Sequence, residues 1–133
     1  MAVIRSFREL DVYRLAREQC QVIFRMSRAF PKDETYSLTD QIRRSSRAVN
    51  TMVAEAWARR RYVAAFANKI NDALGEAMET QAWLDHALDR EYINASRHSE
   101  LDAKWHHVGA MLNRMIETAD TFCKSATAQP RKR

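Results

Sequence analysis

The sequence predicts an all-α fold, an up-down-up-down antiparallel four-helix bundle, and three observations support this prediction. The 133 residues include only two glycines and two prolines, the residues on which tight turns between strands depend. Apolar residues recur at three- and four-residue steps along four long segments. The links between these segments are short, and short links favour antiparallel neighbours. Hydrophobic residues make up 46% and charged residues 29% of the chain, a composition typical of one folded domain and not of a disordered chain.

The first helix is expected from about residue 10 to residue 29. Its polar residues cluster on one side, whereas its apolar residues spread over roughly 200° of the helical wheel, about twice the width that one core-facing stripe needs. A helix this apolar is covered on two sides, and a second subunit is the expected cover. The predicted oligomer interface in this helix comprises Val12, Leu15, Val22 and Met26.

The second helix is expected from about residue 38 to residue 59. Pro31 interrupts the helical pattern before it, and Thr35 or Ser37 is the expected cap. Its core side comprises Leu38, Ile42, Val49, Met52, Val53 and Ala56. Three arginines point away from the centre of that side: Arg43, Arg44 and Arg47. Arg60 would fall on the apolar side if the helix continued, so we expect a basic turn comprising Arg59, Arg60 and Arg61.

The third helix is expected from about residue 62 to residue 88. Its main stripe comprises Phe66, Ile70, Ala73, Ala77, Leu84 and Leu88. Trp83 lies well off this stripe, so it either packs at an edge of the bundle or joins the oligomer interface. On the polar side, Asp72, Glu76 and Glu79 form either a solvated face or partners for arginines of another subunit.

The fourth helix is expected from about residue 100 to residue 122, after a loop over residues 89–99 in which Ser96 or Ser99 provides the cap. It has the cleanest amphipathic pattern in the chain. Its apolar side comprises Leu101, Trp105, Val108, Leu112, Met115, Ile116, Ala119 and Phe122. We expect a single domain over residues 1–123, followed by a basic flexible tail over residues 124–133.

The net formal charge of +5 is unevenly distributed along the chain. Residues 41–69 carry seven basic groups and one acid, residues 70–123 carry four basic groups and ten acids, and residues 124–133 carry four basic groups and no acid. A concentrated positive segment suits contact with a polyanion, and Trp57 and Tyr62 are placed to stack a base. The alternative is that the same groups form a solvated face or bridge subunits. The candidate nucleic-acid contacts are Arg43, Arg44, Arg47, Arg59, Arg60, Arg61 and Lys69.

Patterns that carry enzymatic chemistry are lacking in the sequence. None of the four histidines follows a glutamate by three residues, the spacing of di-iron bundles. His98 is expected in a loop, and His106 and His107 diverge by about 100° on a helix. No nucleophile elbow, Cys-x-x-Cys pair or phosphate-binding glycine loop occurs. We therefore expect no enzymatic activity, no cofactor and no metal site.

The sequence also indicates a compartment. Cys20 and Cys123 lie in apolar helical settings, where we expect small core residues and no disulfide framework. The first ten residues contain no apolar segment of the kind that signal peptides carry. The longest apolar runs are far shorter than the roughly 18 residues that span a bilayer. We expect a cytoplasmic protein without a membrane partner.

Several short strings resemble a known family. The most specific stretch runs from Phe-Pro-Lys at residues 30–32 to Gln-Ile-Arg-Arg at residues 41–44. The segment Phe7–Tyr13, the Ala-Glu pair at residues 54–55 and the Glu-Thr-Gln at residues 79–81 extend the likeness over nearly the whole chain. Together they resemble the bacterial four-helix-bundle family of proteins encoded in intervening sequences of large-subunit ribosomal RNA.

The resemblance implies a cytosolic helical bundle that assembles as a ring-shaped homopentamer and has no enzymatic activity. It implies nucleic-acid binding from charge and genomic setting, and it extends to the accessory variability protein of diversity-generating retroelements, which partners a reverse transcriptase. Arg43 and Arg44 match the Arg-Arg pair of the family, and Glu55 matches its Ala-Glu. Relatives often carry Pro-Ser-Asn-Ile-Ala-Glu-Gly where this chain has residues 50–56 without Pro or Gly, which predicts a more continuous second helix.

The leading interpretation is therefore a non-enzymatic homopentamer that binds RNA or DNA through the second helix and the turn after it. The alternative is a protein-interaction or scaffold module without nucleic-acid binding. In that case acids of the third helix or a protein partner engage the arginines.

Overall fold

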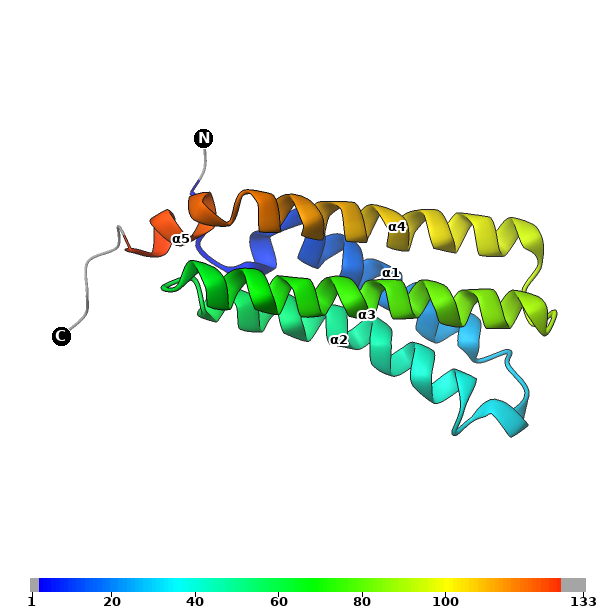
Figure 1. Ribbon diagram of the computed structural model, residues 1–133. Coiled ribbons are helices and arrows are strands. Elements are labelled where there is room, and N and C mark those ends of the chain that lie inside the picture. Colours follow the sequence, from blue (N-terminus) through cyan, green and yellow to red (C-terminus); the bar gives the residue numbers. More distant parts are fainter. Residues whose placement is uncertain (1–2, 128–133) are drawn as a thin grey trace.

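Four long helices lie side by side and alternate in direction in the computed structural model (Figure 1). The structure describes residues 3–127, with side chains through residue 124. The long helices are α1 (Asp11–Ser27), α2 (Leu38–Ala58), α3 (Val63–Asp89) and α4 (Ala95–Glu117). Each packs against its neighbour in the sequence, and α1 also packs against α4, which closes the bundle. No strand occurs among the described residues, so the predicted all-α fold is confirmed.

The entry to α1 contains a 3-10 helix that the periodicity did not predict. This helix, η1 (Phe7–Glu9), is capped by Ser6, whose hydroxyl oxygen accepts a hydrogen bond from the backbone N–H of Arg8 at 3.2 Å. Leu10 has an extended backbone (φ −68°, ψ 130°), so α1 begins one residue later than expected. A second 3-10 helix, η2 (Lys32–Glu34), leads from α1 toward α2.

The bounds of α2 agree with the prediction, but its cap differs. Ser37 occupies the position before the helix, yet its hydroxyl donates a hydrogen bond to Oε1 of Glu34 at 2.6 Å and accepts none from the helix backbone. The hydroxyl of Thr35 donates to the carbonyl oxygen of Lys32 at 2.7 Å. At the other end, α2 stops at Ala58 because Arg59 leaves helical geometry (φ −99°, ψ 13°).

The end of α3 is closed by a left-handed residue. Glu91 has φ 62°, a conformation that favours glycine. Its N–H donates to the carbonyl oxygen of Leu88 at 2.9 Å, and the N–H of Tyr92 donates to that of Ala87 at 2.9 Å. This pair of bonds defines a Schellman motif, which reverses the chain within a few residues and shortens the connection to α4.

The start of α4 corrects the expected loop over residues 89–99. Asn94 is the cap, and its side-chain oxygen accepts a hydrogen bond from the N–H of Arg97 at 2.8 Å. The helix therefore begins at Ala95, and neither Ser96 nor Ser99 caps it. As a result His98, which we expected in a loop, lies in the first turn of α4.

The C-terminal helix is interrupted where the apolar pattern predicts continuity. α4 ends at Glu117, and Thr118 (φ −109°, ψ 26°) donates its hydroxyl to the carbonyl oxygen of Arg114 at 2.7 Å. A separate helix, α5 (Ala119–Thr127), follows. The expected tail over residues 124–133 thus begins within α5, and residues 128–133 of it lie outside the described residues.

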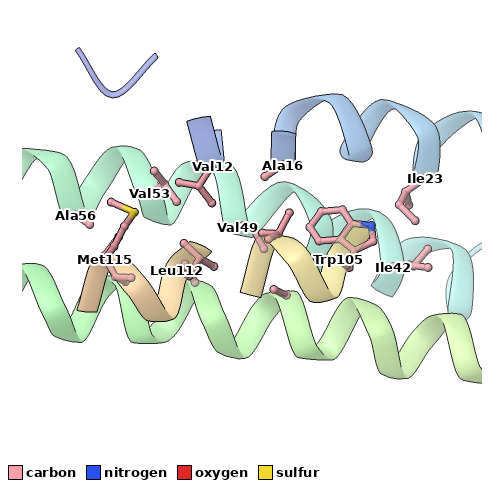
Figure 2. Packing of buried hydrophobic residues seen from close by; sticks show 14 of the residues in the cluster. Val12, Ala16, Ile23, Ile42, Val49, Val53, Ala56, Trp105, Leu112 and Met115 are labelled. Atoms are coloured by element: carbon pink, nitrogen blue, oxygen red, sulfur yellow. The ribbon is translucent and has the colours of Figure 1, made fainter. Parts of the chain in front are cut away.

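The core runs along the axis of the bundle and matches most of the predicted stripes. Figure 2 shows side chains of α1, α2 and α4 meeting around Trp105, which is fully buried. Cys123 is buried as expected, whereas Cys20 is half-buried. Met52 and Leu88, predicted as core, are also only half-buried. The largest fully buried apolar side chains are Trp105, Phe66, Ile23, Ile42, Ile70, Leu84, Leu101 and Leu112.

Candidate nucleic-acid interface

A shallow groove runs along the N-terminal half of α2, and three of the predicted arginines line it. We call it the α2 groove; its lining comprises Thr35, Tyr36, Thr39, Asp40, Arg43, Arg44, Arg47, Ala48 and Thr51. Arg43 and Arg47 are one turn apart on α2, so their side chains lie on the same face. Tyr36 stands beside them with 93% of its surface exposed.

Arg43 and Arg47 gather around an aromatic ring of α1. The guanidinium of Arg43 lies 4.6 Å from the ring centroid of Phe24, with those of Arg28 at 4.7 Å and Arg47 at 6.0 Å. Arg43 also donates from Nε to the hydroxyl oxygen of Ser27 at 2.8 Å. Because that bond uses Nε, the outer edge of the guanidinium remains able to donate to an anion.

Arg44 faces a different element. It forms ion pairs with Glu76 (3.4 Å) and Glu79 of α3. Desolvation alone would lower the pKa of Arg44, but the two carboxylates outweigh it and raise that pKa above its ordinary value. These glutamates therefore pair with an arginine of their own chain and are not merely a solvated face. The charge of Arg44 is already paired with carboxylates of its own chain, so Arg44 is a poor candidate for a phosphate contact.

Lys69 is likewise paired within the protomer. Its ammonium lies 3.2 Å from a carboxylate oxygen of Glu55 on α2 and 3.6 Å from one of Asp72 on α3. The half-buried lysine thus links the ends of two helices. This arrangement removes Lys69 from the set of cations available to a ligand.

The turn between α2 and α3 holds the other three predicted arginines. Arg60 lies 3.5 Å from the ring centroid of Trp57 and donates from Nε to the carbonyl oxygen of that residue at 2.8 Å. Burial lowers the pKa of Arg60. Trp57 is therefore covered and not open to a base, whereas Tyr62 keeps 66% of its surface exposed. Arg59 and Arg61 are exposed and form no ion pair with any described residue.

The predicted oligomer interface divides into two classes. Val12 is only 3% exposed, because it packs in the protomer's own core, and it is not available to a neighbour. Leu15, Val22 and Met26 are half-buried and pack against that core from its edge. Trp83 is also half-buried, and its indole N–H donates to a carboxylate oxygen of Glu79 at 3.1 Å.

Sequence reasoning missed Tyr36, Phe24 and Arg28 as parts of this surface. The helical wheel placed Arg43 and Arg47 on one face, but it could not show which residue of α1 they meet. Exposure of Tyr36 depends on the η2 turn, which periodicity does not reveal. Among the described residues, one group could hold a metal ion, formed by Asp85 of α3 with His98 and Asp102 of α4.

In the part of the chain that the structure describes, no helix has the length and apolar character needed to cross a membrane. The family model described as 23S rRNA-intervening sequence protein matches residues 8–114. A crystal structure of a protein with unknown function from the S23 ribosomal protein family of Bacteroides thetaiotaomicron VPI-5482 superposes with a TM-score of 0.71 and 25% sequence identity. The match covers 79% of this chain and 97% of that one. No curated protein gives a significant match.

Proposed function

The chain belongs to the 23S rRNA-intervening sequence protein family, and we propose that it is a non-enzymatic, homo-oligomeric protein that binds RNA or DNA. The observation that carries this proposal is that three exposed arginines of the basic segment have no acidic partner among the described residues: Arg47, Arg59 and Arg61. Unpaired surface guanidinium groups are well suited to phosphate oxygens. Arg43 supplements them in the α2 groove through the outer edge of its guanidinium.

Each of the two basic clusters includes an exposed aromatic ring. Tyr36 lies beside Arg43 and Arg47 in the α2 groove, and Tyr62 directly follows Arg61 in the turn. Arginine with an adjacent exposed ring is the combination that single-stranded nucleic acids use, because the cation contacts phosphate while a base stacks on the ring. Arg47 and Arg59 are about 18 Å apart along α2 at 1.5 Å per residue, so a ligand that engages both clusters spans several nucleotides.

The proposal uses a smaller set of contacts than the charge pattern predicts. Arg44 and Lys69 are neutralised by carboxylates, and Arg60 is packed on Trp57. We assign binding to the remaining four arginines. The positively charged segment therefore serves two purposes, joining α2 to α3 and contacting the ligand.

We propose a ring-shaped homopentamer as the assembly, with the edge of α1 as one side of the interface. Support comes from the half-buried apolar residues Leu15, Val22 and Met26, which pack against the core from outside. A neighbouring protomer would complete their burial and gain about 25 cal/mol per Å² of apolar surface.

The proposal is tested by titrating the protein into labelled 20-nucleotide RNA and DNA, each as a single strand and as a duplex. The binding constant K is measured at several salt concentrations. We expect the triple variant R47A/R59A/R61A to bind more weakly to all sequences. Its slope of log K against log salt should shrink by about two to three, since each lost phosphate contact removes roughly 0.7 to 0.9. The matched control R17A/K104A/R114A removes the same charge from exposed positions on α1 and α4. Equal weakening by both triples would show a non-specific charge effect and contradict the assignment.

A protein-interaction module without nucleic-acid binding is the second candidate. The ion pairs of Arg44 with Glu76 and Glu79 favour it, because they show a basic residue of α2 engaged by two acids of α3. This reading predicts no binding of any of the four nucleic-acid probes at physiological salt by the wild-type protein.

A further inference from the structure

Three metal-ligand side chains meet where α3 and α4 approach their connection. Asp85 lies one turn before the end of α3, and His98 and Asp102 lie one turn apart on α4. The i, i+4 spacing puts the last two on one face of the helix, directed at Asp85. One ligand atom from each of the three residues lies within 4.8 Å of the other two.

The contacts within this cluster leave negative charge in excess. Nε2 of His98 lies 2.8 Å from Oδ1 of Asp85. Asp102 accepts a hydrogen bond at 3.1 Å from the side-chain amide of Gln81, a neutral partner. Even a protonated imidazole would balance only one of the two carboxylates. The nearby cation Arg97 is paired with Glu100 at 3.3 Å. A divalent ion would compensate both carboxylates.

We propose that Asp85, His98 and Asp102 form a binding site for a divalent transition metal ion, with Zn²⁺ as its best match. One imidazole nitrogen and two carboxylate oxygens form a donor set that Zn²⁺ accepts. Mg²⁺ demands an octahedral oxygen shell and seldom gives up its water, so it should bind poorly here. Three protein ligands leave the fourth tetrahedral position to water or to another molecule.

The geometry needs only small movements to accept the ion. Metal–ligand bonds of 2.0 to 2.2 Å place tetrahedral ligands about 3.4 Å apart, whereas the present atoms are separated by up to 4.8 Å. The side chain of Asp85 is 67% exposed and can swing inward. The contact between Asp85 and His98 must open slightly, and the ion then replaces the hydrogen bond that joins them.

A bound ion would hold α3 and α4 together at the end of the bundle. The Schellman turn at Glu91 and the cap at Asn94 already fix the connection between these helices, so the two sides of the site are positioned before the metal arrives. An ion that binds only the folded chain raises the melting temperature, and the stabilisation grows with the logarithm of the ratio of free ion to Kd.

The test is a competition for Zn²⁺ between the full chain, without a histidine tag, and a chromophoric chelator. We expect one ion per chain and a weakening of about tenfold or more for His98→Ala and for Asp102→Asn. The matched control is His107→Ala, which removes an exposed imidazole from another face of the same helix. Mg²⁺ at the same concentration should not raise the melting temperature, whereas Zn²⁺ should.

Asp85→Asn keeps the shape of the cluster and removes one negative charge. It therefore tests the site while the imidazole ring of His98 stays in place. The imidazole resonances of His98, followed by NMR, should shift on addition of one equivalent of Zn²⁺. The proposal is overturned if His98→Ala and His107→Ala weaken binding equally. It is also overturned if the wild-type chain binds no Zn²⁺ at about 100 μM free ion, an affinity below that of a weak specific site.

Discussion

Arg43, Arg44 and Arg47 illustrate at the residue scale how neighbouring arginines of one helix differ in what they can bind. Arg44 lies between two carboxylates of α3, whereas Arg43 and Arg47 lie over the ring of Phe24. An ion pair satisfies a guanidinium's charge, but a contact with a ring face leaves that charge available to an anion. Tertiary partners therefore decide which of these residues suits a ligand.

The sequence identified these arginines as a group and could not separate them. The helical wheel shows that Arg43 and Arg47 share a face, because that depends only on the 3.6-residue repeat. The pairing of Arg44 with Glu76 joins residues 32 positions apart, and the sequence left Glu76 as either solvated or intersubunit. Local periodicity carries no information about such a contact.

Glu91 gives a prediction at the residue scale. Its left-handed backbone (φ 62°) costs an L-residue roughly 1 kcal/mol or more, whereas glycine adopts it freely. We expect Glu91→Gly to raise the free energy of unfolding by about 1 kcal/mol, measured by urea denaturation.

The matched control for this prediction is Arg90→Gly, one position earlier, where the backbone has negative φ (−85°). That change gains no relief of strain and should destabilise the chain through added freedom of the unfolded state. A lower urea midpoint for Glu91→Gly than for the wild type would contradict the assignment of strain to this turn.

At the scale of elements, the helix pattern predicted α1, α2 and α3 to within two residues at each end. Such long segments bury a continuous apolar stripe, so their existence follows from periodicity. The ends of α4 were predicted less well. The apolar pattern places Asn94 in a loop and predicts that a serine after it caps the helix, whereas Asn94 itself is the cap. Thr118 breaks a helix whose apolar residues continue on both sides. Both features depend on single hydrogen bonds that the apolar pattern does not record.

The η2 turn and the connection after α3 are joined by a contact that gives a pH-dependent prediction. The hydroxyl of Ser37 donates to one carboxylate oxygen of Glu34 at 2.6 Å, and the hydroxyl of Tyr92 donates to the other at 2.8 Å. These bonds hold the pKa of Glu34 below its ordinary value of 4.5. The bond to Glu34 also raises the pKa of Tyr92.

A carboxyl whose pKa is lowered in the folded state stabilises the protein above its unfolded pKa, and this stabilisation is lost as pH falls through the folded pKa. Tyr92→Phe removes one bond to Glu34, so we expect the variant to lose less stability than the wild type between about pH 5 and pH 3. Urea midpoints across that range measure the difference. Tyr13→Phe, a half-buried tyrosine in α1, is the control, and an identical acid limb in Tyr92→Phe and wild type would refute the link.

At the scale of the whole molecule, the two proposed binding regions lie on different helices of the bundle. The arginine clusters lie along α2 and the turn after it, whereas the proposed metal site joins α3 to the start of α4. The ten acids of residues 70–123 therefore serve two purposes. Glu76 and Glu79 pair with Arg44 of α2, Asp72 pairs with Lys69 of its own helix, and two further acids contribute to the metal cluster. Charge asymmetry along the chain becomes attraction between adjacent helices once the bundle forms.

The edge of α1 gives the last prediction, because it determines whether protomers associate. Light scattering on a size-exclusion column should give a mass near five times the 15.5 kDa of one chain. Val22→Lys places a charge among half-buried apolar residues of that edge, and an unpaired charge inside an interface is strongly unfavourable. The variant should therefore elute as a smaller species with unchanged helical circular dichroism, because lysine can extend its charge to water on the free protomer. Val63→Lys, at an exposed apolar position at the start of α3, should keep the wild-type mass. If Val22→Lys retained the full assembly, the interface would lie elsewhere, and a wild-type monomer would remove the need for a second cover on α1.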